Sequence, residues 1–266
     1  MADKARSGSD RTEDVWIYPD TGMGNIGYMG SVNWYGLMVT AGILMGTAVA
    51  DKLRRKQGLN QSSWEVLPWI IIPGVIGARL YHVVDLWWYY QDNLRLIPAV
   101  WTGGLGIFGG IGGGIVGLWW WIHKTYKSNK TYIFLKWLDV VAVGAPLGQT
   151  IGRWGNYFNQ ELYGKATSLP WGIYIKAEDN YFHPLFAYES LWNLLVFGVL
   201  WWVSGRKRWV GGSVFALYLG LYGLGRFGLE WLRIESWPVN KIVSLSLVVL
   251  SWVYIWTRHR RNLSFS

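Results

Sequence analysis

The sequence contains no cysteine among its 266 residues. This absence excludes disulfide bonds within the chain, metal sites built from thiolates, and catalysis by a cysteine nucleophile. Any thiol that reacts here must therefore come from another molecule. Histidine is also scarce, because the four histidines are scattered and form no metal-binding spacing. We therefore predict no metal site and no cofactor.

Charged residues make up only 15% of the chain, which leaves no room for a large soluble domain. The formal net charge of +9 is compatible with a nucleic-acid partner, but the Lys and Arg residues lie in short clusters between apolar runs. There is no Walker-type G-K-[ST] motif, and two G-x-G-x-x-G matches, at Gly104 and Gly223, lie outside any strand-turn-helix unit. We expect neither a nucleic-acid partner nor a nucleotide site.

The abundant residues are those of a membrane protein. Hydrophobic residues make up 52% of the chain, 21 Trp and 16 Tyr suit interfacial belts, and 34 Gly suit close helix packing. The composition predicts an all-α polytopic membrane protein with about seven spans. The apolar runs are Val32–Ala50, Trp64–Val84, Gly104–His123, Trp137–Ile151, Pro184–Val203, Val210–Leu224 and Lys241–Trp256.

Four basic clusters alternate with the spans and indicate the orientation. They are Lys52, Arg54, Arg55 and Lys56; Lys124, Lys127, Lys130 and Lys136; Arg206, Lys207 and Arg208; and Arg258, Arg260 and Arg261. The positive-inside rule places these clusters in the cytoplasm, with the N-terminus outside and the C-terminus inside. Residues 1–30, which lack the pattern of a signal peptide, are expected to be an extracytoplasmic tail or arm. Residues 31–257 then form the membrane domain, and residues 258–266 form a basic cytoplasmic tail.

An insertion between the fourth and fifth spans covers residues 152–183. It contains Pro170, Gly172 and short alternating stretches such as WGIYIKA, which predict a small irregular or β-containing head outside the membrane. Pro146 lies shortly before it and is expected to kink or loosen the end of the fourth span. Most acidic residues also fall on this outer half, so polar chemistry is expected there.

The third span is rich in glycine. Gly106, Gly110 and Gly114 share one row of a helix there, and Gly109, Gly113 and Gly117 share the adjacent row. Rows of small residues let helix backbones approach closely. We expect this helix to pack tightly on a neighbour.

The most informative stretch is GRWGNYFNQELYG, from Gly152 to Gly164. Arg153 offers a fork of donors that suits a phosphate, and Asn156, Asn159 and Glu161 are expected to orient it. A charged residue at the edge of an apolar run is costly to desolvate and normally has a partner or a task. The alternative is that Arg153 only snorkels toward lipid headgroups.

Further polar residues are predicted at the same outer side of the membrane. Tyr35, and Arg79 with His82, lie at the outer ends of the first two spans, where interfacial anchoring is the alternative role. Arg226, Glu230 and Arg233 lie along one face if the sixth helix continues, although an exposed ion pair of little consequence would look the same.

His183 in HPLFAYES opens the fifth span and is either a structural residue at a helix start or a titrating base. Nothing in its neighbourhood in the sequence decides between these roles.

Four segments together resemble the bacterial phosphatidylglycerol:prolipoprotein diacylglyceryl transferase family. GRWGNYFNQELYG matches the family signature G-R-x-G-N-[FY]-x-N-x-E-x-x-G at every fixed position. WYG at Trp34 to Gly36, HPLFAYES and YGLGRFGLEWLR occur in the family order. The resemblance implies seven transmembrane helices in the bacterial cytoplasmic (inner) membrane, with an outward-facing head.

The resemblance also implies a reaction. The diacylglyceryl group of phosphatidylglycerol would move to the thiol of a lipobox cysteine in the signal peptide of a preprolipoprotein, which suits a chain without cysteine. Arg153 would hold the lipid phosphate, Asn156, Glu161 and Gly164 would complete its loop, and Arg226 and Glu230 would form the opposing wall. Tyr35 matches the family's tyrosine in the first helix, and Asn159, His183, Arg233 and Arg79 are supporting candidates.

One position departs from some relatives. They carry a histidine in the third span where this chain has Phe108. Because phenylalanine cannot take a proton, a base would have to be Glu230, Glu161 or His183, unless the arginines alone lower the pKa of the thiol.

Two other classes of membrane protein are alternatives to this transferase. A transporter predicts charges near mid-bilayer and an internal repeat, and neither is found in the sequence. A non-catalytic membrane protein that binds anionic lipid predicts the same arginines without transfer.

Overall fold

The computed structural model describes residues 28–29, 32–206 and 210–263. The expected tail at residues 1–30 therefore lies almost wholly outside the described residues, as do Lys207 and Arg208. The long helices are α1 (Trp34–Lys56), α2 (Ser63–Asp85), α4 (Ile107–Thr125), α5 (Lys130–Asn159), α6 (Leu185–Ser204), α7 (Ser213–Leu229) and α8 (Pro238–Leu263). Shorter elements are β1 (Tyr28–Met29), β2 (Val32–Asn33), α3 (Trp87–Tyr90), η3 (Leu94–Leu96), η4 (Val100–Thr102), β3 (Ile173–Ile175), β4 (Asn180–Phe182) and η5 (Glu230–Leu232).

The helices have the length and surface of membrane spans. Five of them, α1, α2, α5, α6 and α8, are long and apolar enough to cross a bilayer. The most exposed example is α8, whose large apolar side chains face outward along its length. Those that are more than half exposed are Val239, Ile242, Val243, Leu245, Val249, Leu250, Trp252, Val253 and Trp256. These helices confirm the prediction of an all-α, multi-pass membrane protein.

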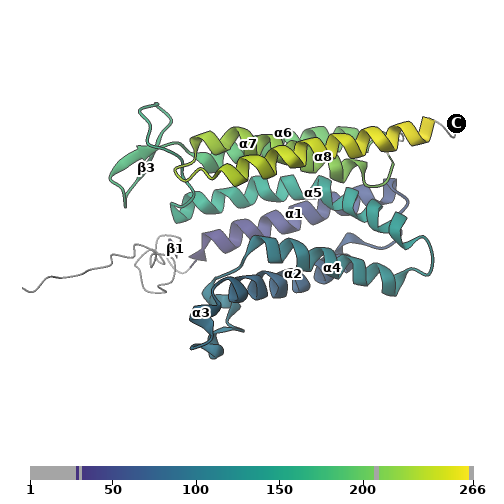
Figure 1. The fold of residues 1–266 in the computed structure, drawn as a ribbon, viewed down its shortest axis with the longest axis horizontal. Helices are drawn as coiled ribbons and strands as arrows, with labels where there is room; N and C mark the ends of the chain where they lie inside the picture. Colours follow the sequence, from purple (N-terminus) through teal and green to yellow (C-terminus); the bar gives the residue numbers. More distant parts are fainter. Residues whose placement is uncertain (1–27, 30–31, 207–209, 264–266) are drawn as a thin grey trace, which may run out of the picture.

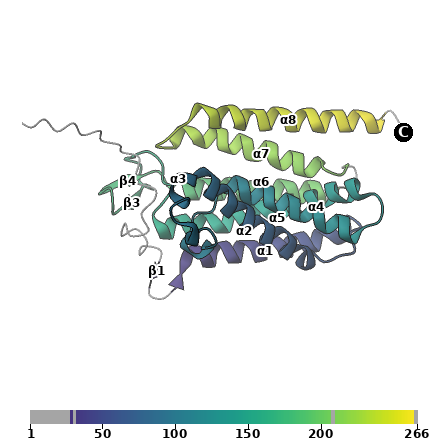
Figure 2. The same cartoon turned by 60° about the horizontal axis from the view of Figure 1, so that its bottom comes forward.

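The long helices pack in pairs within one elongated bundle. The main contacts join α1 with α5, α2 with α4, and α7 with α8, while α6 packs against both α5 and α7. Figure 1 shows the elongated bundle, and Figure 2 shows α8 at its outer edge, with α7 between α8 and the remaining helices. The C-terminal ends of α1, α4, α6 and α8 lie at the end of the bundle opposite the small β3–β4 sheet. The basic clusters that the structure describes follow these helix ends.

Glycines set the distance between α2 and α4. A Cβ atom added at Gly109 would lie 2.1 Å from the Gly77 carbonyl oxygen, and one at Gly113 would lie 2.1 Å from the Pro73 carbonyl oxygen. Because real Cβ atoms never approach this closely, only glycine allows the two backbones to touch. The expected tight packing of the third span is confirmed, and the row of Gly109, Gly113 and Gly117 makes the closest contacts.

Close glycine contacts also join α1 to α5. A Cβ atom at Gly42 would lie 2.5 Å from the Gly148 carbonyl oxygen, and one at Gly144 would lie 2.3 Å from the Gly46 carbonyl oxygen. This contact continues along α5 to Gly155, where an added Cβ atom would strike the Tyr35 ring at 2.7 Å. The α1–α5 pair therefore places Tyr35 beside the Gly152 to Gly164 stretch.

Several helix boundaries differ from the predicted ones, and two of these differences affect the candidate site. Helix α5 runs unbroken for 30 residues to Asn159, so Pro146 does not end it and Arg153 is helical rather than part of the head. The apolar run Trp137–Ile151 is shorter than this helix, because polar side chains of the last two turns pack inside the bundle. Helix α7 ends at Leu229, so Glu230 belongs to a 3-10 turn and the expected single helical face with Arg233 is not formed.

The apolar core fills the end of the bundle that carries the basic clusters. It includes Trp137 and Val140 on α5, Ile122 on α4 and Leu200 on α6, each at most 1% exposed. In this half Asp139 of α5 accepts hydrogen bonds from the first turn of α7, at Gly212 N (2.7 Å) and Phe215 N (2.8 Å). This end is therefore packed and closed, which leaves the opposite end for polar groups.

At that opposite end, a small sheet forms between α5 and α6. Strands β3 and β4 pair antiparallel, and residues 164–167 lie beside β4 through the bridge between Ala166 and Phe182. Gly164 also bridges to Arg233, and Lys165 N donates to the Leu232 carbonyl at 2.8 Å. The segment after α7 is thus held in place by the backbone of this sheet region.

Candidate functional site

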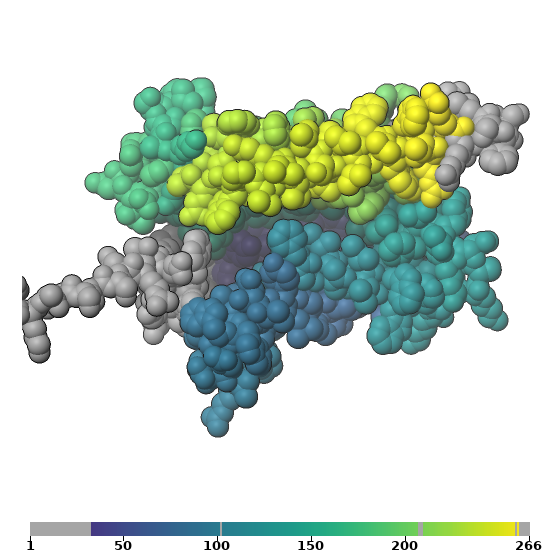
Figure 3. All heavy atoms as spheres, viewed as in Figure 1, coloured from purple at the N-terminus to yellow at the C-terminus, as the bar shows by residue number. Residues whose placement is uncertain are grey.

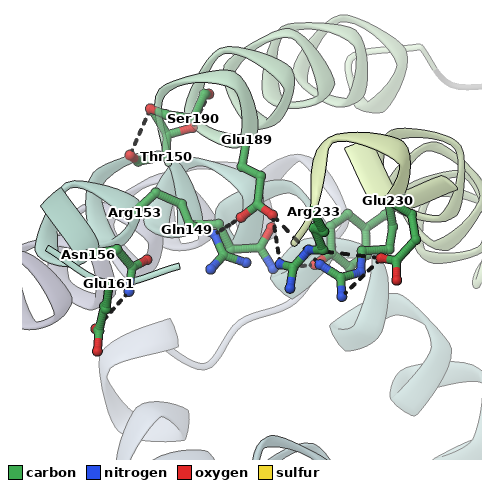
Figure 4. Close-up of polar contacts among 11 residues, drawn as sticks. Gln149, Thr150, Arg153, Asn156, Glu161, Glu189, Ser190, Glu230 and Arg233 are labelled. Carbon is green, nitrogen blue, oxygen red and sulfur yellow. Dashed lines mark hydrogen bonds and ion pairs between the residues drawn. The ribbon is translucent and has the colours of Figure 1, made fainter. Parts of the chain in front are cut away.

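Glu189 is the centre of a network of arginines. Its Oε2 lies 2.6 Å from Arg153 Nε, and its Oε1 lies 3.2 Å from Arg233 Nη2 and 3.7 Å from Arg226 Nη1. Figure 4 shows the Glu189 side chain pointing between Arg153 on one side and Arg233 on the other. Groups from α5, α6, α7 and the segment after α7 therefore meet at one carboxylate.

Glu230 is the second carboxylate of the network. It is fully buried, with Oε2 lying 3.4 Å from Arg226 Nη2 and 3.9 Å from Arg233 Nε. Its Oε1 accepts from Trp237 N at 3.2 Å and from Asn240 Nδ2 at 3.0 Å. Glu230 therefore ties the two arginines to the start of α8 and is not the exposed pair considered from the sequence.

Local structure explains how these groups converge. Glu189 is the single charged residue of α6, four residues after the helix begins at Leu185. At Glu230 the chain changes from α-helix to a 3-10 turn, and the bridge from Gly164 holds Arg233 in extended conformation. A Cβ atom at Gly164 would lie 2.7 Å from the Leu232 carbonyl oxygen, so a side chain there would displace this bridge.

The charges of the network do not cancel. Three guanidiniums face two carboxylates, Glu189 and Glu230, which leaves one excess positive charge. Arg153, Arg226 and Arg233 keep 28%, 23% and 19% of their side chains exposed, so they are partly accessible. A partly desolvated site with one spare positive charge is suited to a singly charged anion.

A small pocket of about 20 Å³ opens beside the network. It is lined by Arg153, Glu189, Trp192, Asn193, Tyr222, Gly225, Arg226 and Leu229. Arg153 and Arg226, which the sequence placed in separate motifs, thus share one cavity. Glycine is needed at position 225 of the lining, because an added Cβ atom would lie 2.1 Å from Trp192 Nε1.

The other residues of the Gly152 to Gly164 stretch form a separate cluster. Glu161 Oε1 accepts from Asn156 Nδ2 at 2.9 Å and from Asn159 Nδ2 at 3.3 Å. Figure 4 shows this pair to one side of Arg153, away from Glu189. These residues close the turn after α5. We expected them to orient the Arg153 guanidinium, but Glu189 makes that contact. Tyr35 lies within electrostatic range of both Glu161 and Arg153.

His183 belongs to a different contact. Its Nδ1 lies 3.3 Å from the Tyr188 hydroxyl, which also accepts from Trp171 Nε1 at 2.8 Å. Its backbone pairs with Gly164 and Lys165 in the sheet region. Within the described residues, His183 makes no ion pair with the arginine network.

Arg79 and Phe108 lie elsewhere. The buried Arg79 guanidinium donates to the carbonyls of Ile97 at 2.8 Å, Gly103 at 2.7 Å and Gly104 at 3.1 Å, and also to Leu96. It therefore closes the loop between α2 and α4, and its donors are occupied by that backbone. Phe108, on α4, is 70% exposed and packs near Tyr81.

Sequence reasoning missed Glu189 as a site residue. The signal was present, because a lone carboxylate in the apolar helix of HPLFAYES is costly unless cations accompany it. Its three partners come from segments up to 44 residues away, so no local spacing revealed them.

Together the fold and the site define a multi-pass helical membrane protein with a partly buried arginine–glutamate network at one end. The family described as "Prolipoprotein diacylglyceryl transferase" matches residues 25–257. The chain belongs to this family. It is 37% identical to a protein of Clostridioides difficile over 242 residues, covering 88% of this chain and 94% of that protein. It is also 37% identical over 249 residues to a protein of Gloeobacter violaceus, covering 87% of this chain and 90% of that protein. Both carry the name phosphatidylglycerol–prolipoprotein diacylglyceryl transferase.

Proposed function

We propose that this chain transfers the diacylglyceryl group of phosphatidylglycerol to a cysteine thiol of a prolipoprotein. Membership of the family supports the reaction, and the names of the relatives support both substrates. In finer detail, the acceptor is the lipobox cysteine of a preprolipoprotein signal peptide. A thiolate sulfur attacks the glycerol carbon that carries the phosphate, a thioether forms, and the electron pair of the broken C–O bond leaves with glycerol phosphate.

The proposed site rests on the convergence of Arg153, Arg226 and Arg233 on two carboxylates, Glu189 and Glu230, which leaves one unneutralised positive charge. A phosphodiester carries one negative charge, and the leaving phosphate monoester carries nearly two. The arginines therefore bind the developing product charge more strongly than the starting lipid, which is the difference that accelerates a reaction. The same field lowers the pKa of an approaching thiol and favours its thiolate.

Glu189 and Glu230 hold the guanidiniums in place in this mechanism. Without them, three like charges would repel one another in a partly desolvated site. Glu230 is fully buried, so it is a poor acceptor for a proton from a bound peptide. Glu161 is exposed and remains a candidate acceptor, as does His183.

Lipid access is proposed from the side of the bundle. Figure 3 shows a groove between α7 and α8 on one side and α2 and α4 on the other, with α1 at its floor. Acyl chains in such a groove would stay in the bilayer while the headgroup reaches the network. The groove thus provides a route between helices that avoids pulling a lipid into water.

The proposed topology has seven spans in the bacterial inner membrane. Helices α4 and α7, of 19 and 17 residues, would complete the five longer spans. The basic clusters support a cytoplasmic position for the closed end. In the proposed orientation the N-terminus, the sheet between α5 and α6, and the arginine network face outward. The finer division into an arm, a membrane domain and a basic tail keeps the boundaries predicted from the sequence.

Mass spectrometry tests the reaction directly. Purified protein is incubated with phosphatidylglycerol and a synthetic lipobox peptide, and a diacylglyceryl mass increment on the cysteine is expected. The same peptide with serine in place of cysteine is the matched control. A lipid-binding protein without transferase activity, or a transporter, would bind or move lipid and leave the peptide mass unchanged.

A further inference from the structure

Asn193 is a buried amide without a protein partner. It lies on α6, is only 6% exposed, and lines the same pocket as Arg153 and Arg226. Within the part of the chain that the structure describes, its side chain makes no hydrogen bond. Because Asn193 lines the pocket, its amide is open to a group that enters there, and such a group is expected to pair with it.

Asn193 lies deeper in the bundle than the charged residues. Asn193 follows Glu189 by four residues on α6, and Tyr222 precedes Arg226 by four residues on α7. Each neutral group is therefore one helical turn, about 5.4 Å, farther from the end of the bundle that holds the arginines. Both line the pocket, and the Tyr222 hydroxyl also lacks a hydrogen bond to the described residues. A charged layer thus lies above a neutral layer of donors.

Helix α5 repeats this arrangement. Gln149 lies one turn before Arg153, and its Nε2 donates to the Tyr218 hydroxyl of α7 at 2.8 Å. Figure 4 shows Gln149 beside the arginine network. Farther along α6, Val196 is 1% exposed and belongs to the apolar core. The neutral layer is therefore a narrow polar band between the charges and the core.

A phospholipid has the same order of groups. Its phosphate is followed, one glycerol unit deeper, by two ester carbonyls, and then by hydrocarbon. Ester carbonyls only accept hydrogen bonds, and the Asn193 amide and the Tyr222 hydroxyl offer donors. A soluble phosphate would occupy the charged layer and leave Asn193 unpaired.

We propose that Asn193, with Tyr222 beside it, donates hydrogen bonds to an acyl ester carbonyl of the lipid whose phosphate the arginines hold. Asn193 is thereby a specificity-determining residue that favours ester-linked over ether-linked lipid. This inference rests on the proposed function, because that function supplies the lipid and its orientation.

The experiment compares two lipids. Phosphatidylglycerol with ester-linked chains and its dialkyl ether analogue are both competent, because the bond that breaks joins glycerol carbon to phosphate oxygen. Wild-type protein is expected to prefer the ester lipid in kcat/KM by roughly two- to tenfold, the effect of one net hydrogen bond. Asn193→Leu and Asn193→Ala should bring this ratio close to one, mainly by losing activity on the ester lipid.

Ser204→Ala is the matched control. Ser204 is also buried on α6, but it bonds to the Trp201 carbonyl at the opposite end of the helix, so its loss should leave the ratio unchanged. Equal use of both lipids by wild-type protein would overturn the proposal. An unchanged ratio in Asn193→Ala, with both activities lowered alike, would also overturn it and indicate a structural role.

Binding provides a second readout that does not need turnover. Native mass spectrometry of purified protein with an equimolar lipid mixture should show wild-type occupancy favouring the ester lipid, and equal occupancy in Asn193→Ala. If wild-type protein transfers neither lipid, the proposed function fails while this occupancy ratio still tests Asn193. The experiment therefore distinguishes a failure of the Asn193 proposal from a failure of the proposed function.

Discussion

Arg153 Nε lies 2.6 Å from Glu189 Oε2, which makes this ion pair between α5 and α6 the shortest in the described part of the chain. Two further arginines reach the other oxygen of the same carboxylate, at 3.2 and 3.7 Å. The pair therefore organises the network as well as joining two helices.

Arg153→Ala should abolish transfer to a lipobox peptide. The variant loses a guanidinium that faces the pocket, and loss of one such donor typically costs a factor of about 10²–10³ in kcat. Arg153→Lys should retain little activity, because an ammonium cannot reproduce the bidentate geometry. Product mass spectrometry measures both variants. Arg55→Ala, at the basic end of α1, is the control and should retain activity; full activity in Arg153→Ala would remove the phosphate-binding assignment.

Glu189→Gln should impair both transfer and stability. The change leaves three guanidiniums facing a single carboxylate, and breaking a buried pair from one side costs up to about 3–5 kcal/mol. Because Glu189 is 11% exposed at its side chain, an effect in the upper part of that range is expected. Thermal unfolding in detergent and peptide transfer are measured together. Wild-type unfolding temperature with wild-type transfer would show that the network does not depend on this carboxylate.

His183→Gln should leave substantial turnover if His183 is structural. Its imidazole contacts the Tyr188 hydroxyl, and its backbone carries the sheet pairing, which glutamine preserves. Tyr188→Phe is the partner variant and should behave in the same way. The measurement is the initial rate of transfer. A loss as large as that of Arg153→Ala, confined to His183→Gln, would instead support a role as proton acceptor.

Arg79→Ala should lower stability without a selective effect on lipid binding. Its guanidinium holds four loop carbonyls between α2 and α4, and these would be left without their donor. We expect a lower unfolding temperature and an unchanged KM for phosphatidylglycerol in the folded fraction. A raised KM at unchanged stability would return Arg79 to the site.

Gly113→Ala and Gly112→Ala form a matched pair on α4. The new methyl group at residue 113 would lie 2.1 Å from the Pro73 carbonyl oxygen, whereas a methyl group at residue 112 meets nothing within 4 Å. We expect Gly113→Ala to destabilise the protein by about 1–3 kcal/mol. Gly112→Ala should be neutral or stabilising by up to about 1 kcal/mol, because alanine favours helix. Thermal unfolding measures both, and equal behaviour would contradict the close α2–α4 contact.

The sequence by itself determined the class of protein and the residues worth testing. The lipid environment sets these patterns: spans are helices because the backbone polar groups must be satisfied internally, their side chains are apolar, aromatic residues lie at the interface, and rows of glycine let helices pack closely. The signature around Arg153 and the segment around Arg226 could also be recognised from the sequence, because a motif is defined by residue types at fixed spacing and does not require the fold.

Tertiary structure alone decided which charges meet. Glu189 pairs with arginines from three other segments. Arg79 donates to loop carbonyls, and Asn156 donates to Glu161. The physical reason is that an ion pair depends on the distance and exposure of its two groups in space, whereas helix formation depends on neighbours along the chain.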